Sequence, residues 1–478
     1  MSDDLLLRPA TELARLLRTR ELSARELLET SIDRRDEVDP VLNALVVRDD
    51  ERARQRAGEL DDAVVSTGPV GPLHGLPTAH KDLLDAAGLV TSFGSRVFAD
   101  NVARTDSVLA ARVRAAGAVR VGKTNTAELG AGSQTHNPLF GVTRNPYDPT
   151  RTPGGSSGGA AAALATGMVA VADGSDMGGS LRNPASFCNV VGLRPTPGRV
   201  PNVPSRDAWF DLSVVGPMGR RAADVALLLA AVSGPDSRDP YATWPQLPPV
   251  EGLDRDLSGV RAAWGRDLGL PYEPAVLEAH DRARPGVESL GMVLTDAEPP
   301  LRGADEVFRV LRGWHMATTI GDAVERAGDA VGPMVRGNVA YGRTVTAAQL
   351  AAAQHRRTAL LQAAAGLFAD HDYLFLPVSQ VLPFDADEPW VREIEGEVMP
   401  DYLGWMRSAY LISVLRVPAA SVPAGFTPDG LPVGLQVVGR PGDDLGVLQV
   451  AHALEQVFRA HERTPDLTAL RHGADQEP

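Results

Sequence analysis

Two serine clusters flanked by glycine lie between Gly154 and Pro184. The first is the pair Ser156 and Ser157, and the second is Ser180, 24 residues after Ser156. Glycine allows backbone conformations that bring a loop close to a ligand. A hydroxyl beside several free N–H groups is what acyl transfer needs, because one loop can then supply a nucleophile and stabilise the oxyanion. A Gly/Ser linker is the alternative, but a linker does not enclose an apolar run such as residues 160–172.

A lysine near a buried strand is the second feature that could do chemistry. Residues 75–82 read GLPTAHKD, which places Lys81 and Asp82 directly after a short predicted strand. Lysine in such a position is costly unless it has polar partners. A surface Lys81–Asp82 pair is the simpler structural interpretation, and an acid–base role is the functional one.

Regular elements around the serines are expected to position them. Residues 160–165 form a helix directly after the glycines, so its first N–H groups point back at the serine pair. Residues 168–172 are short, apolar and partly β-branched, which predicts a buried strand. Residues 173–180 are then the turn that leaves this strand, and residues 181–188 begin a helix.

Three stretches resemble the amidase signature family. GGSSGG followed by DMGGSLRNPA, within residues 154–185, is similar to its signature, and residues 75–82 are similar to its G-x-P-x-x-x-KD segment. Residues 423–440 resemble its closing strand–turn–strand. The resemblance runs from about Thr11 to Phe458 and is weakest over residues 240–400. It implies a serine hydrolase that uses lysine rather than histidine.

The resemblance assigns a role to each candidate residue. Ser180 matches the nucleophile, Ser156 the bridging serine on a cis peptide bond, and Lys81 the base. A neutral lysine requires a pKa near 7 instead of about 10.4, a shift that burial favours. The oxyanion donors would be the N–H groups of Met177, Gly178, Gly179 and Ser180. Met177 departs from the threonine or isoleucine that is common in the family.

Supporting residues follow from the same resemblance. Ser157 and Arg182 would hold the two catalytic serines, Asp176 would brace the turn, and Ser133 would orient Lys81. Candidate substrate contacts are Gly132, Gln134, Trp314, Trp405 and Tyr410. The three aromatic residues have an alternative interpretation as core packing.

Composition excludes several classes of protein. A net charge of −14 and a pI of about 5.2 disfavour binding to nucleic acid and to anionic membranes. The single cysteine, Cys188, excludes an intrachain disulfide and a multi-thiolate metal site, and we expect no cofactor. The acidic start MSDDLLLRPA does not resemble a signal peptide, and no apolar run reaches 18 residues. We expect a cytoplasmic monomer or homodimer that binds a small molecule.

Alternating predicted strands and helices favour one α/β domain over residues 1–478. The expected fold is a three-layer α/β/α sandwich whose large, mixed, mostly parallel sheet is covered by helices on both faces. Its expected parts are N-terminal helices (1–65), the signature core (69–235), a variable substrate-side region (240–400) and a closing core (401–460). Residues 384–400 are expected to form an acidic loop.

The expected function is hydrolysis of the C–N bond of small aryl or alkyl amides through an acyl-enzyme on Ser180, with esters and carbamates as further substrates (a urethanase-type activity). One alternative is the A-type component of a glutaminyl-tRNA amidotransferase, which would need an ATP-dependent partner. Another is a Ser-His-Asp esterase of the α/β-hydrolase type, because residues 155–159 match G-x-S-x-G. That motif needs a strand before it, and two prolines within residues 147–153 argue against one.

Overall fold

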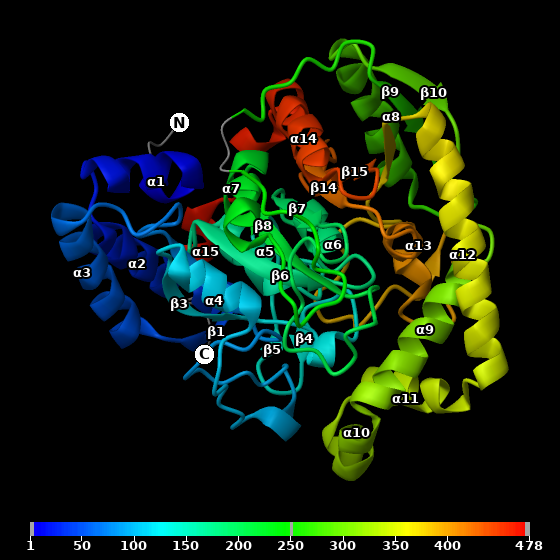
Figure 1. Ribbon diagram of the computed structural model, residues 1–478, viewed down its shortest axis with the longest axis horizontal. Helices are drawn as coiled ribbons and strands as arrows, with labels where there is room; N and C mark the ends of the chain where they lie inside the picture. Colours follow the sequence, from blue (N-terminus) through cyan, green and yellow to red (C-terminus); the bar gives the residue numbers. More distant parts are fainter. Residues whose placement is uncertain (1–3, 249–251, 474–478) are drawn as a thin grey trace.

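A computed structural model describes residues 4–248 and 252–473, and an eleven-stranded mixed sheet runs through it (Figure 1). In spatial order the strands are β1 (Leu45–Arg48), β3 (Val119–Thr124), β2 (Pro77–Lys81), β6 (Val171–Asp176), β8 (Val214–Gly219), β7 (Val191–Arg194), β14 (Ala419–Phe426), β15 (Pro432–Gly439), β11 (Tyr373–Pro377), β9 (Arg261–Trp264) and β10 (Val293–Asp296). Two short hairpins, β4–β5 (His136–Asn137, Gly141–Val142) and β12–β13 (Glu393–Ile394, Glu397–Val398), lie outside it.

The mixed α/β architecture is confirmed, but its sheet contains fewer parallel pairs than expected. Four of its ten pairings are parallel: β2–β3, β2–β6, β9–β10 and β9–β11. The other six, which include the whole centre of the sheet, are antiparallel. The connections explain this, because β14 and β15 are joined by a short turn and no helix lies between β7 and β8. Parallel neighbours need a longer crossover, usually a helix.

Helices cover the sheet, and the central strands β7, β8 and β15 are buried along their whole length. The helices are α1 (Ala10–Thr19), α2 (Ala24–Leu42), α3 (Asp50–Ser66), α4 (Val108–Ala115), α5 (Gly158–Ala165), α6 (Arg182–Phe187), α7 (Ala222–Val232), α8 (Pro274–Ser289), α9 (Ala304–Thr319), α10 (Gly321–Ala327), α11 (Pro333–Thr344), α12 (Ala347–Asp370), α13 (Arg407–Ser413), α14 (Asp444–Phe458) and α15 (Leu467–Gly473). The predicted capping box of Ser23 and Glu26 is present at the start of α2. No helix of the described residues is long and apolar enough to cross a membrane.

Helices α9 to α12 form a group at one end of the molecule, in which α9 and α12 share a core cluster with β11, β14 and β15, and α10 and α11 lie furthest from the sheet (Figure 1). Their inner side carries a small apolar cluster formed by Ala131, Met316, Val324, Val331, Val335 and Val339. This group of helices lies within residues 240–400, the stretch that was expected to vary with the substrate.

Two element predictions need correction. The strand expected at residues 168–172 is β6, which begins at Val171 and continues through polar residues to Asp176. Pairing with β8 along this whole length explains the difference, since the ladder satisfies the backbone whatever the side chains are. Residues 384–400, expected as a loop, contain the β12–β13 hairpin, and Ile394 and Met399 are buried in the core.

The register of β2 and β6 brings together the two segments that carry Lys81 and Ser180. Thr78 lies opposite Val171 and Ala79 opposite Ala172 in a parallel pair. Both strands therefore end at the same edge of the sheet, where Lys81 meets the polar end of β6.

Candidate active site

Lys81 is the last residue of β2, and its side chain is 0% exposed. Its Nζ atom lies 2.7 Å from the Oγ of Ser156, 2.8 Å from that of Ser157 and 3.1 Å from that of Ser175. The alternative of a surface pair with Asp82 is therefore wrong. Three hydroxyls, rather than a carboxylate, surround the amine among the described residues.

Burial lowers the pKa of Lys81 to about 7. A charged ammonium loses its hydration when it is buried, and hydroxyls replace that hydration only in part. The charges of Asp176 and Asp173 oppose the shift without reversing it. A substantial fraction of Lys81 is thus neutral near pH 7 and able to accept a proton.

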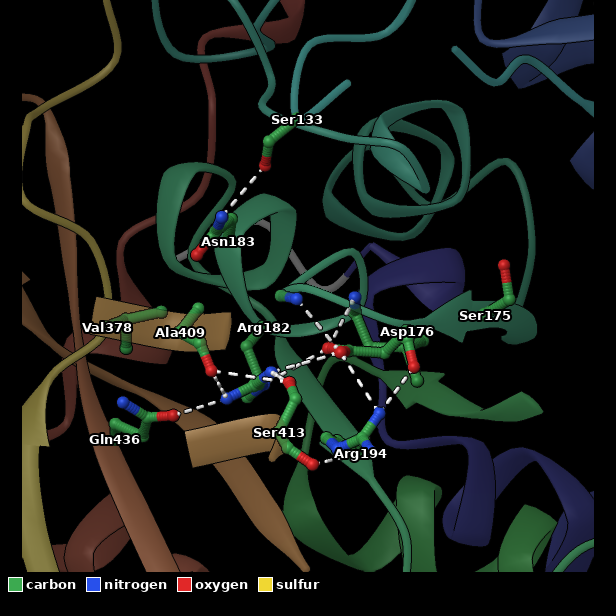
Figure 2. A network of polar contacts seen from close by, with 12 residues as sticks. Ser133, Ser175, Asp176, Arg182, Asn183, Arg194, Val378, Ala409, Ser413 and Gln436 are labelled. Atoms are coloured by element: carbon green, nitrogen blue, oxygen red, sulfur yellow. Dashed lines mark hydrogen bonds and ion pairs between the residues drawn. The ribbon is translucent and has the colours of Figure 1, made fainter. Parts of the chain in front are cut away.

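The peptide bond between Gly155 and Ser156 is cis, as the resemblance implied. The carbonyl of Gly155 accepts a hydrogen bond from Ser133 Oγ at 2.8 Å. Ser133 Oγ in turn accepts one from Asn183 Nδ2 at 2.8 Å (Figure 2). Ser133 was expected to orient Lys81, but it holds the backbone before Ser156 instead.

A turn wrapped around Asp176 carries Ser180. The carboxylate accepts hydrogen bonds from the N–H groups of Gly179 (2.9 Å) and Leu181 (3.2 Å), so Asp176 braces the turn directly. Gly179 was expected to donate to an oxyanion, yet its N–H donates to Asp176 here. The carbonyl of Ser180 accepts the N–H of Ser157 at 3.2 Å, which joins the two serine loops. No hydrogen bond of the described residues links the hydroxyls of Ser156 and Ser180.

Asp176 also lies between two buried arginines, as Figure 2 shows. Arg182 donates to both carboxylate oxygens at 3.0 Å, and Arg194 donates to the carbonyl of Asp176. Burial alone would raise the pKa of Asp176, but the two guanidinium groups hold it well below its usual range. Arg182 further donates to Gln436 (2.6 Å) and to Ser413 (2.7 Å), which fastens the turn to β15 and α13.

The predicted substrate contacts do not gather at one surface. Trp405 is 1% exposed and packs between Phe187 and Phe384. Tyr410 is buried against Phe308, with ring centroids 4.2 Å apart, and donates to Asp305. Both belong to the core, which was the alternative interpretation.

The remaining three candidates are Gly132, Gln134 and Trp314, and none of them lines the cavity of about 830 Å³ beside α11. Gln134 donates to the carbonyl of Ala386, Trp314 is half-buried on α9, and Gly132 lies within a buried loop. The pattern of residue types did not distinguish pocket from core here.

A cavity of about 830 Å³ lies between α11 and residues 389–403, the segment that contains the β12–β13 hairpin. Aromatic and apolar residues line much of it, including Ala131, Pro333, Met334, Tyr341, Trp390, Tyr402 and Leu403. Arg309 donates to Asp401 at 2.5 Å, Glu128 accepts from Ser95 and from the N–H of Gly332, and the guanidinium of Arg392 stacks on the ring of Trp390. The aromatic and apolar lining suits an apolar group.

None of Lys81, Ser156 and Ser180 lines this cavity. Ala131, which does line it, lies two residues before Ser133, whose hydroxyl holds the carbonyl before Ser156. The candidate chemistry is therefore placed by the hydrogen-bonded residues and not by this cavity.

Sequence reasoning missed Ser175 and Asn183, which contact Lys81 and Ser133 respectively. Ser175 was assigned to a turn, and recognising it as a strand residue beside Asp176 would have placed it near the end of β6, next to Lys81 at the end of β2. Within residues 4–248 and 252–473, no group of three or more His, Cys, Asp and Glu residues is arranged to hold a metal ion. Residues 152–157 form no strand before Ser157, so the nucleophile elbow of an α/β-hydrolase is absent from this described segment.

Comparisons with known proteins find similar chains of nearly the same length. A family model described as Amidase matches residues 26–448. The chain is 35% identical to an acylamidase of Rhodococcus erythropolis (95% of this chain and 96% of that protein) and 34% identical to the A-type component of the glutamyl-tRNA(Gln) amidotransferase of Symbiobacterium thermophilum (96% and 98%). The solved structure of a bacterial aryl acylamidase of the amidase signature family superposes with a TM-score of 0.87, at 28% identity over 99% of both chains.

Proposed function

The chain belongs to the amidase signature family, and we propose that it cleaves small, neutral aryl and alkyl amides through an acyl-enzyme on Ser180. It is a hydrolase of C–N bonds other than peptide bonds. The observation that carries the proposed mechanism is the 2.7 Å contact between the fully buried amine of Lys81 and the hydroxyl of Ser156.

Proton transfer begins at Lys81 in this mechanism. The neutral amine takes the Ser156 proton while Ser156 takes the proton of Ser180, whose Oγ attacks the substrate carbonyl. The resulting oxyanion accepts from the N–H groups of Met177, Gly178 and Ser180, because the N–H of Gly179 is shared with Asp176. The C–N bond then breaks as Ser156 returns a proton to the departing amine. Water repeats the same sequence at the acyl-enzyme and releases the acid.

The large cavity supports a neutral substrate with an apolar group. Tyr341, Trp390 and Tyr402 offer aromatic surface, while the charges of Arg309 and Asp401 neutralise each other. The similarity to an acylamidase and to an aryl acylamidase favours amides of aromatic amines. Esters and carbamates pass through the same tetrahedral oxyanion, so the same donors would serve them.

An amidotransferase component is the second candidate. It is supported by the 34% identity to the A-type component of the Symbiobacterium thermophilum amidotransferase over 98% of that protein. Such a component would act on glutamine within a complex, whereas a free amidase would act on its own.

One assay separates the candidates. The purified chain is incubated alone with an anilide, a primary amide, a p-nitrophenyl ester and an aryl carbamate, and release of each amine or alcohol is compared with the Ser180→Ala variant. We expect rapid cleavage of the anilide and slower cleavage of the carbamate. Inactivity on all four, with glutamine hydrolysis only after the other components of an amidotransferase are added, would favour the second candidate.

A further inference from the structure

A second, smaller cavity of about 160 Å³, which we call the rear cavity, lies on the face of β2 opposite to the face that carries the Lys81 side chain. Side chains of a strand alternate between its two faces, so Thr78 and His80 point away from Lys81. Both line this cavity, together with residues of α3, α4 and β3. The catalytic lysine and the cavity are therefore separated by one strand.

The walls of this rear cavity carry an excess of positive charge. Four arginines line it, Arg52, Arg56, Arg114 and Arg120, against two aspartates, Asp49 and Asp106. The aspartates pair with Arg120 (2.6 Å) and Arg114 (2.7 Å). Arg52 lies 3.7 Å from Asp49 and donates to the carbonyl of Gly88, and Arg56 pairs with Glu59, which is half exposed and does not line the cavity. This excess stands out in a chain whose net charge is −14.

The floor of the rear cavity contains an unsatisfied hydroxyl. Thr78 is 1% exposed, and its Oγ1 has no hydrogen-bond partner among the described residues. A buried hydroxyl without a partner costs free energy that a bound acceptor would recover. His80 lies beside it with Nδ1 bound to Asp173, and no hydrogen bond to the other ring nitrogen occurs in the described part of the chain.

Asp173 connects this floor to the catalytic lysine. One carboxylate oxygen lies 2.5 Å from His80 Nδ1, and the other accepts the backbone N–H of Lys81 at 3.0 Å. Asp173 is buried, so its charge acts on Lys81 with little screening by water.

We propose that the rear cavity binds a small anion, either a carboxylate or an inorganic oxyanion, and that its occupancy acts on Lys81 through His80 and Asp173. The anion accepts from Thr78 Oγ1 and from the arginines and favours the doubly protonated imidazole ring of His80. That cation neutralises Asp173, whose negative charge otherwise stabilises protonated Lys81. The amine then loses its proton more readily. A cavity of this size admits acetate, phosphate or a small aromatic acid.

Other charges near Lys81 and His80 are already compensated. Asp176 lies between Arg182 and Arg194, and the buried amine of Lys123 faces Asp82 at 3.9 Å. Around His80, the charged groups of α3, α4, β3 and the adjoining loops are the four arginines and two aspartates of the cavity wall, together with Lys123, which lies opposite His80 on β3. β6 contributes Asp173, whose charge also acts on Lys123. Asp173 is the carboxylate that contacts both His80 and the backbone of Lys81.

Binding can be measured without any reference to catalysis. Inorganic phosphate, acetate and benzoate are titrated separately into the whole purified chain by calorimetry at constant ionic strength. We expect saturable binding that weakens at least about tenfold in Thr78→Val and in Arg56→Gln, since each loses one hydrogen bond to an anion. Arg54→Gln, on the same helix but outside the cavity, is the matched control. Tighter binding of phosphate than of acetate and benzoate, or the reverse, shows whether the site takes an inorganic oxyanion or a carboxylate. Absence of saturable binding to the wild-type chain, or binding that is equal in all variants, overturns the proposal.

The coupling rests on the proposed role of Lys81 and is tested separately. The pH profile of kcat/KM for an anilide is recorded with and without saturating anion. We expect the anion to move the acidic limb to lower pH in the wild type and to leave it unmoved in Asp173→Asn. If the anion binds but the acidic limb of the pH profile does not move, the coupling to Lys81 is wrong and the anion site stands. If Ser180→Ala keeps full activity, the proposed function fails while the binding result stands.

Discussion

The signature core and the helical group α9 to α12 differ in how deeply their ion pairs are buried. In the core, Asp176, Arg182 and Arg194 are all 0% exposed, and each has several hydrogen-bond partners. In the helical group, Arg309 and its partner Asp401 are 22% and 41% exposed, and Arg357 of α12 is the exception, because its pair with Asp211 is buried. Buried charges tolerate only one arrangement, because an unpaired partner is costly, whereas exposed pairs contribute little. The core thus fixes the geometry of the chemistry, and the helical group can vary with the substrate.

Apolar packing shows the same difference. The core cluster around the sheet includes most of the strands, while α10 and α11 share a cluster of only a few valines with Ala131 and Met316. Substitutions in the core should therefore act on kcat or on folding, and substitutions around the large cavity should act on KM. Five experiments test this division.

Ser180→Ala should give the largest effect on turnover. Removal of a serine nucleophile costs on the order of 10⁴-fold or more in kcat, yet deleting one hydroxyl from a glycine loop should change the free energy of unfolding by less than about 1 kcal/mol. Anilide turnover and urea unfolding are measured together, with the exposed Ser289→Ala as control. Turnover near that of the wild type would remove Ser180 from the mechanism.

Lys81→Met should lower amide turnover by about 10³-fold, the usual size of a general-base contribution. Activated esters should lose less, because their leaving groups need no proton. In the wild type, kcat/KM should rise with pH through about 7, where Lys81 becomes neutral. Equal losses on anilide and p-nitrophenyl ester would mean that Lys81 is mainly structural.

The same variant makes a prediction about stability. The pKa of Lys81 is about 7 in the folded chain and about 10.4 when unfolded. Between these values the unfolded chain binds the extra proton, so the lysine destabilises the fold fully below pH 7 and progressively less as pH rises toward 10. The free energy of unfolding of the wild type should therefore rise, relative to that of Lys81→Met, by about 1.4 kcal/mol per pH unit in this window. Urea unfolding at pH 7, 8 and 9 measures the difference, and a constant difference would contradict a buried, neutral lysine.

Asp176→Asn and Asp401→Asn compare the two regions directly. The first leaves two buried guanidinium groups without their carboxylate and should cost about 3–5 kcal/mol. The second weakens a partly exposed pair with Arg309 and should cost less than about 1 kcal/mol. Urea unfolding of both variants at pH 7 is the measurement. Similar losses would show that the two regions are not different in the way proposed.

Much of the core could be predicted from sequence because local patterns determine it. The capping box at Ser23, the apolar helix of residues 222–232 and the glycine-flanked serines all mark structure within a few residues. The polar end of β6 was missed because Asp173 and Ser175 are typical of turns, and only pairing with β8 keeps them in a strand.

The large cavity could not be predicted because segments far apart in sequence line it. Glu128, Met334 and Trp390 come from three separate stretches of the chain. Trp405, three residues after Tyr402, is buried in the core instead, and aromatic character alone does not separate the two. The neighbours that decide between these positions are set by the fold.

Trp390→Ala should give the smallest effect and the one most specific to substrate. Trp390 lines the large cavity and packs against Arg392, whose guanidinium carbon lies 4.1 Å from the ring centroid. Loss of its aromatic surface should raise KM for an anilide by about 5- to 30-fold, equivalent to about 1–2 kcal/mol of apolar contact, and leave kcat within about threefold. Trp209→Ala is the control, since Trp209 is 73% exposed and lies outside this cavity. KM for acetamide, which has no aromatic group, should change little in either variant. If Trp390→Ala instead lowered kcat equally for both substrates, the ring would be supporting the catalytic core, and the division between a fixed core and a variable substrate side would fail.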